Sequence, residues 1–132
     1  PTLFYFGFMA RILVIDDEPL ILEMVQDMLE EAGHEVMTAS NSHEGMARFK
    51  ESPVKLVVTD LFMPEGGGLE GIQMFKTNYP EVKIIVITGI DDRIRDGVMA
   101  AAQGLGADRM FAKPLRMADL LAAIDELLAE SS

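Results

Sequence analysis

The sequence predicts a single α/β domain in which helices cover both faces of a parallel sheet. Short apolar runs alternate five times with segments whose apolar residues recur at helical spacing, and this alternation is typical of a parallel sheet. The chain has 132 residues, of which 49% are hydrophobic, which suffices for one domain with a full core. Three of the runs are almost continuously apolar, as strands buried on both faces are.

The strand candidates are short and rich in apolar and β-branched residues. They are Arg11–Asp16, Glu35–Ala39, Lys55–Asp60, Lys83–Thr88 and Arg109–Ala112. The first, third and fourth are typical of central strands, whereas the second and fifth are more polar and typical of edge strands. This division favours a doubly wound (βα)5 sheet with five parallel strands in the order 2-1-3-4-5, the flavodoxin-like arrangement.

A helical pattern follows each strand candidate. Pro19 suits the first turn of the first helix and Gly33 ends it. Asn41 and Glu44 resemble a capping box before the second helix, and the third helix stops before Pro80. The last two helices are indicated by apolar residues at helical spacing, which are Ile94, Val98, Ala101, Ala102 and Leu105, then Met117, Leu120, Leu121, Ile124 and Leu128.

Charge and composition exclude several partners. The net charge of −11 argues against binding to nucleic acid or to an anionic membrane surface. The absence of cysteine excludes disulfides and thiolate metal sites, and it is compatible with a cytoplasmic location. We interpret residues 1–8 as an added tail, with an extra β-like arm as the alternative, and residues 9–130 as the domain. We interpret His34 and His43 as surface or turn residues.

Polar side chains gather at the carboxyl ends of the predicted strands, where open α/β sheets bind ligands. Asp16 ends the first strand and Asp17 comes next, Asp60 ends the third strand and Thr88 the fourth, and Lys113 follows the fifth. One such acid alone is commonly a solvated loop residue, but the coincidence of all five indicates a site. Close carboxylates repel by roughly 4 kcal/mol per pair at an effective dielectric near 20, so the cluster requires a cation. Oxygen ligands without His or Cys favour Mg²⁺ or Mn²⁺.

These residues also carry a resemblance to a known family. The motifs, in chain order, are Asp16-Asp17, Asp60-x-x-Met63-Pro64 with Gly68 four residues further on, Thr88-Gly89 and Lys113-Pro114. With them the sequence resembles the receiver domains of two-component response regulators, from about Ala10 to the last helix.

The resemblance implies a phosphoacceptor in a two-component phosphorelay. Asp60 would be phosphorylated by the phosphohistidine of a sensor histidine kinase or of a phosphotransfer protein, and a conformational switch would then signal to an unknown downstream effector. Asp16, Asp17 and Asp60 would hold Mg²⁺ or Mn²⁺, together with the backbone carbonyl of Phe62. Such a domain is not an enzyme, although it takes part in its own phosphorylation and dephosphorylation. A homodimer is compatible with this function.

The remaining motif residues have implied roles at the same edge. Lys113 would pair with the phosphoryl oxygens, and Thr88 would donate its hydroxyl to one of them, next to the small Gly89. Pro114 resembles the cis-proline position that aims the lysine. These assignments place the phosphoryl-binding and switch residues at the carboxyl ends of the fourth and fifth strands.

The loop after the nucleophile has its own expected functions. Leu61, Phe62 and Met63 would shield a hydrolysable bond, Pro64 would stiffen the loop, and Gly68 matches the loop glycine of the family.

Two positions concern hydrolysis, and one departs from the family. Phe62 and Ile90 stand two residues after the nucleophile and the switch threonine, where they would flank the approach of water and slow hydrolysis. The family usually has Tyr or Phe as a switch side chain where this chain has Met110, and Phe111 would face the opposite side of the strand.

Two other functions remain as alternatives. A haloacid-dehalogenase-like phosphatase also uses an Asp nucleophile with Mg²⁺, but it usually has a second Asp where this chain has Phe62. A pseudo-receiver that acts only as an interaction module would be expected to lack part of the acidic set.

Overall fold

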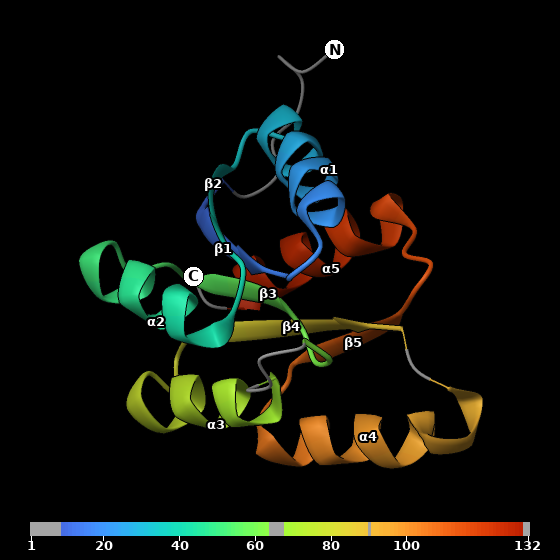
Figure 1. The fold of residues 1–132 in the computed structure, drawn as a ribbon. Helices are drawn as coiled ribbons and strands as arrows, with labels where there is room; N and C mark the ends of the chain where they lie inside the picture. Colours follow the sequence, from blue (N-terminus) through green and yellow to red (C-terminus); the bar gives the residue numbers. More distant parts are fainter. Residues whose placement is uncertain (1–8, 64–67, 90, 131–132) are drawn as a thin grey trace.

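The computed structural model describes residues 9–63, 68–89 and 91–130, and within these ranges five strands form one parallel sheet (Figure 1). The strands are β1 (Arg11–Ile15), β2 (Glu35–Ala39), β3 (Leu56–Asp60), β4 (Lys83–Thr88) and β5 (Arg109–Ala112). Their order is β2-β1-β3-β4-β5, and every neighbouring pair is parallel. The predicted fold class and strand order are therefore confirmed.

Helices cover the two faces of the sheet unequally (Figure 1). They are α1 (Pro19–Glu31), α2 (Ser42–Glu51), α3 (Gly68–Asn78), α4 (Asp92–Leu105) and α5 (Met117–Glu130). α1 and α5 pack on one face, and α2, α3 and α4 pack on the other. None of the helices in the described ranges combines the length and the apolar character that crossing a bilayer requires.

The core is divided into two clusters by the sheet. Ile12 and Val14 of β1 face α1 and α5, whereas Leu13 and Ile15 face the side of α2 and α3. Successive side chains of a strand point to opposite faces, so a strand covered on both faces needs apolar residues throughout. All of these residues are at most 2% exposed, and burial of each contributes roughly 1.5–3 kcal/mol.

The ends of several elements differ slightly from the sequence prediction. β1 ends at Ile15 and β3 begins at Leu56, although the backbone N–H of Asp16 still donates to the carbonyl of Ala39. At the start of α2, the Asn41 side chain accepts a hydrogen bond from the backbone N–H of Glu44, as predicted. The Glu44 carboxylate reaches back to the N–H of Ser40 rather than to that of Asn41, so the capping box is extended by one residue.

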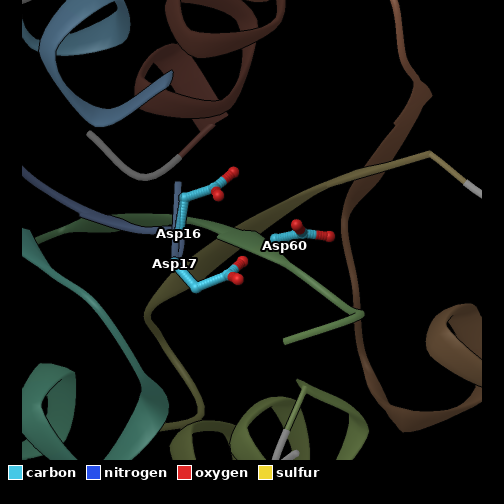
Figure 2. Close-up of side chains that lie close together, drawn as sticks. All are labelled: Asp16, Asp17 and Asp60. Carbon is cyan, nitrogen blue, oxygen red and sulfur yellow. The ribbon is translucent and has the colours of Figure 1, made fainter. Parts of the chain in front are cut away.

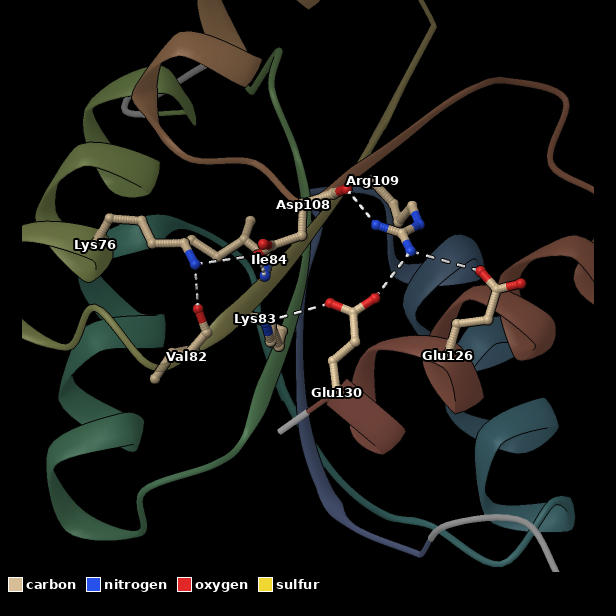
Figure 3. Close-up of polar contacts among 8 residues, drawn as sticks. All are labelled: Lys76, Val82, Lys83, Ile84, Asp108, Arg109, Glu126 and Glu130. Carbon is tan, nitrogen blue, oxygen red and sulfur yellow. Dashed lines mark hydrogen bonds and ion pairs between the residues drawn. The ribbon is translucent and has the colours of Figure 1, made fainter. Parts of the chain in front are cut away.

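A polar network ties α3 to the amino ends of β4 and β5 (Figure 3). The ammonium of Lys76 donates to the carbonyl of Val82 at 2.6 Å and to the carboxylate of Asp108 at 3.0 Å. Asp108 also accepts from the backbone N–H of Ile84 at 2.8 Å. Because Lys76 and Asp108 are partly buried, this pair is better shielded from water than a surface ion pair is.

Ion pairs also tie α5 to the same end of the sheet (Figure 3). The guanidinium of Arg109 lies 3.6 Å from Glu126 and 3.4 Å from Glu130, and Glu130 also lies 3.6 Å from Lys83. The amino ends of β4 and β5 are therefore tied to helices on both faces of the sheet.

His34 is buried directly after the turn that ends α1, so it was wrong to interpret it as a possible surface residue. It is 4% exposed, and its Nδ1 accepts a hydrogen bond from the backbone N–H of Ala10 at 3.2 Å. Nε2 therefore carries the proton, and it has no hydrogen-bond partner among the described residues. Burial lowers the pKa of His34, and the charge of Asp125 offsets only part of this effect.

We expect His34 to make stability depend on pH. Because its pKa is lower in the folded chain, the unfolded chain binds the proton more readily, and this contribution to stability is lost as the pH falls below about 6.5. His34→Leu should cost roughly 1–3 kcal/mol at pH 7.5, because the Ala10 N–H loses its acceptor. Between pH 7.5 and 5.5, however, its urea midpoint should fall less than that of the wild type.

The exposed His43 supplies the control for this measurement. His43→Gln should keep the pH dependence of the wild-type midpoint. A His34→Leu variant whose midpoint falls as steeply as that of the wild type would contradict the assignment.

Candidate functional site

Three carboxylates meet where β1 and β3 end side by side (Figure 2). Asp60 is the last residue of β3, and Asp16 and Asp17 directly follow β1. Each offers a carboxylate oxygen, and these oxygens all lie within 4.8 Å of one another. Asp16 and Asp60 are 3% and 4% exposed, whereas Asp17 is half-buried. The predicted acidic set is therefore brought together at the carboxyl ends of the strands, as predicted.

Backbone N–H groups hold one oxygen of each buried carboxylate. Oδ1 of Asp16 accepts from the N–H of Glu18 at 2.9 Å, and Oδ1 of Asp60 accepts from the N–H of Phe62 at 3.1 Å. Burial raises the pKa of Asp16, and the charge of Asp60 adds to this increase, although the Glu18 N–H and Lys113 oppose it. The ionised form of Asp16 is therefore less stable here than in water, and a cation bound nearby would stabilise it.

Lys113 is the positive charge that the structure places against these acids. Its Nζ lies 3.2 Å from Asp60, 3.3 Å from Glu18 and 3.4 Å from Asp16. Burial alone would lower the pKa of Lys113, but the charges of Asp60 and Asp16 outweigh it, and the pKa is raised. Because one ammonium faces several carboxylates, the site at the carboxyl ends of the strands keeps an excess of negative charge.

Neighbouring backbone holds Lys113 in place. Its N–H donates to the carbonyl of Thr88 at 2.9 Å, and the Lys113–Pro114 peptide bond is cis, as expected. The stem of Lys113 passes close to Gly89, where an added Cβ would lie 3.3 Å from the lysine Cδ. A small residue at position 89 therefore gives the lysine its path to the acids.

Thr88 carries a buried hydroxyl at the end of β4. The residue is 0% exposed, and Oγ1 has no hydrogen-bond partner among the described residues. Buried hydroxyls are normally hydrogen-bonded, so this one is available to donate to an oxygen that enters the site.

The loop after Asp60 differs from its expected function at two positions. Leu61 and Met63 pack in the core, whereas Phe62 is 49% exposed, so only Phe62 of the three presents its side chain to solvent. Gly68 is required by packing, because a Cβ there would lie 2.0 Å from the carbonyl oxygen of Leu61. Pro64, assigned to stiffen this loop, lies outside the described residues.

Met110, the predicted switch position, and Phe111 lie on opposite faces of β5. Met110 packs toward the cluster under α3 and α4, and Phe111 packs toward the cluster under α1 and α5, as expected. Ile90, the second residue assigned to control hydrolysis, lies outside the described residues, as do residues 1–8 of the predicted tail.

Glu18 also lies at the site, although the sequence did not indicate it. It is the N-cap residue of α1, and its carboxylate lies 3.3 Å from Lys113, which is 95 positions away in the chain. Its place directly after the acidic pair was a signal, but no sequence pattern indicated that its side chain points to the lysine.

The donor set fits a hard divalent cation. Asp16, Asp17 and Asp60 supply only carboxylate oxygens, which Mg²⁺ and Mn²⁺ prefer over nitrogen and sulfur. The cluster also has more negative charge than Lys113 balances. A cation held here would leave the Thr88 hydroxyl and the Lys113 ammonium available to a further anionic ligand.

We expect Mg²⁺ to stabilise the folded chain. Binding to the folded state alone adds about 1.4 kcal/mol when the Mg²⁺ concentration is about ten times Kd. Asp17→Asn should remove most of this gain, because one ligand loses its charge. Thermal unfolding with and without Mg²⁺ measures the effect, and Asp27→Asn, an exposed acid on α1, is the control. Equal melting temperatures for the wild type with and without Mg²⁺ would rule out the cation site.

Known proteins resemble this chain over most of its length. The family model described as response regulator receiver domain matches residues 12–125. The transcriptional regulatory protein AruR of Pseudomonas aeruginosa is 35% identical over 123 residues, which cover 89% of this chain and 49% of AruR. The alkaline phosphatase synthesis transcriptional regulatory protein PhoP of Bacillus subtilis is 30% identical, with 92% and 49% covered. The chain therefore spans about half the length of these relatives.

Solved structures of receiver domain proteins also resemble this chain, and here nearly the whole length of both chains is covered. A receiver domain protein described as CheY-like, from Methanospirillum hungatei, superposes with a TM-score of 0.85 at 31% identity, covering 94% of this chain and 97% of that one. A response regulator receiver domain protein from Clostridium thermocellum gives a TM-score of 0.82 at 36% identity, covering 92% and 95%.

Proposed function

The chain belongs to the receiver domains of two-component response regulators, and from this premise we propose that Asp60 is its phosphoacceptor. The carrying observation is the buried carboxylate of Asp60, which lies with Asp16 and Asp17 on one side and Lys113 on the other. Receiver domains bind Mg²⁺ at such acidic clusters, and we assign the ion here to Asp16, Asp17 and Asp60, with the carbonyl of Phe62. Mn²⁺ would meet the same preference for oxygen.

The phosphodonor is the phosphohistidine of a sensor histidine kinase or of a phosphotransfer protein. Oδ1 of Asp60 accepts the N–H of Phe62, which leaves Oδ2, the oxygen next to Lys113, for attack on phosphorus. The new P–O bond forms as the P–N bond of the donor breaks, and the imidazole nitrogen leaves with the electron pair. When bound, Mg²⁺ supplies positive charge to the transferring group.

Residues of this chain stabilise the transferred group. The ammonium of Lys113 balances charge on the phosphoryl oxygens, and the hydroxyl of Thr88, which has no partner in the described part of the chain, donates to one of them. Thr88 would move inward to do so, and Met110 would respond on β5. Because Met110 lacks a hydroxyl, it cannot make the directional hydrogen bond that Tyr would make at this position, and we expect a less two-state response.

The partners follow from this chemistry. A receiver domain acts between a histidine kinase and a downstream effector, and the matched relatives named above are transcriptional regulators. A cytoplasmic location and a homodimer remain predictions. The phosphatase alternative is not favoured, because Phe62 stands where a general acid is needed, and the pseudo-receiver is not favoured, because the acidic set is complete.

Asp60→Asn should abolish phosphorylation and leave the fold intact, because the amide matches the carboxylate in size but is a far weaker nucleophile. The test incubates the protein with acetyl phosphate and Mg²⁺ and follows the intact mass. The wild type and the Asp27→Asn control should each gain one phosphoryl group. A variant that still gains this mass, with wild-type circular dichroism, would show that another acid is the acceptor.

The phosphoryl group should hydrolyse slowly. The exposed Phe62, which we pair with Ile90, cannot orient or deprotonate a water molecule. Phe62→Asn should speed the loss of phosphoprotein several-fold, and more so when combined with Ile90→Glu, whereas Phe62→Leu should stay close to wild type. The measurement is the phosphorylated fraction over time in Mg²⁺ after the donor is removed. A double variant no faster than wild type would refute this role.

A further inference from the structure

Lys113 has one carboxylate partner that lies outside the acidic cluster. Its Nζ is 3.3 Å from Oε1 of Glu18, as close as it is to Asp60 at 3.2 Å and Asp16 at 3.4 Å. Glu18 occupies the N-cap position of α1, yet its side chain makes no capping hydrogen bond to that helix. The carboxylate instead reaches the residue that follows β5.

The backbones at both ends of this contact are held in place. The N–H of Glu18 donates to Asp16 at 2.9 Å, and its carbonyl accepts the N–H of Leu22 at 3.1 Å. The N–H of Lys113 donates to the carbonyl of Thr88 at 2.9 Å. The ammonium can therefore exchange partners by rotation of long side chains, without a shift of either backbone.

A divalent cation would disturb the present arrangement of charges. Lys113 contacts Asp16 and Asp60, which are two of the three carboxylates in the cluster. A cation bound by these carboxylates would repel the ammonium. It would also neutralise the negative charge with which the ammonium now pairs. Glu18 is then the contacting carboxylate that remains, and its side chain is 59% exposed, so water can complete the hydration of the pair.

We propose that Glu18 is a positioning residue, which holds the ammonium of Lys113 while a divalent cation occupies Asp16, Asp17 and Asp60. This inference rests on the proposed function. With Glu18 present, the lysine withdraws from the cluster but stays at its edge, ready to pair with an incoming phosphoryl group. Without Glu18, the ammonium keeps competing with the cation for Asp16 and Asp60, and the cation binds more weakly.

The test measures the Kd of Mg²⁺ by titration calorimetry in a double-mutant cycle of Glu18→Gln and Lys113→Gln. Glu18→Gln alone should weaken binding about two- to fivefold at low ionic strength, the range expected of an exposed ion pair. In the Lys113→Gln background the same substitution should have a clearly smaller effect, because no ammonium remains to be held.

Glu23→Gln separates this role from a general loss of negative charge. Glu23 is an exposed acid on the same helix, and its substitution should leave the Kd close to wild type. Equal effects of Glu18→Gln in the two lysine backgrounds, unchanged binding or tighter binding would each overturn the inference, even if Asp60 is phosphorylated normally. A wild-type protein that neither binds Mg²⁺ nor accepts a phosphoryl group would overturn the proposed function as well.

Discussion

The mutual repulsion of carboxylates at one edge of the sheet is the constraint on which the rest of the site depends. The carboxyl ends of β1 and β3 bring Asp16, Asp17 and Asp60 within 4.8 Å of one another, and two of these acids are almost fully buried. Lys113 offsets part of the repulsion. A bound cation would relieve the repulsion that Lys113 leaves unbalanced. Cation binding is therefore linked to the stability of the whole domain.

The fold can hold such a cluster because apolar side chains pack on both faces of the sheet. β1 and β3 contribute side chains to both hydrophobic clusters, in which all five helices pack, so their carboxyl ends are held by the core on both faces. Backbone N–H groups of Glu18 and Phe62 then fix the buried carboxylates. Solvated loop residues would move apart under this repulsion, but these acids are held in place. They therefore form a ligand set that is arranged before a cation binds.

Local patterns in the sequence were sufficient for the fold and for most of the site. Continuous apolar runs identified the central strands, and strand ends identified the acids, Thr88 and Lys113. Features that depend on side-chain direction were not predictable: Glu18 turns away from its own helix toward Lys113, and His34 is buried although it follows a turn. Likewise, an apolar tripeptide after Asp60 gave no sign that Leu61 and Met63 enter the core while Phe62 stays exposed.

The two ends of the fifth strand are bound differently by charged side chains. Figure 3 shows Asp108 and Arg109 bound to α3 and α5. The opposite end of β5 leads to Lys113, whose ammonium contacts three carboxylates. The backbone at this end is also held, by pairing of Ala112 with Thr88 and by the N–H of Lys113. A change of charge at the site would therefore be absorbed by the long side chain of Lys113, while β5 itself stays in register with β4.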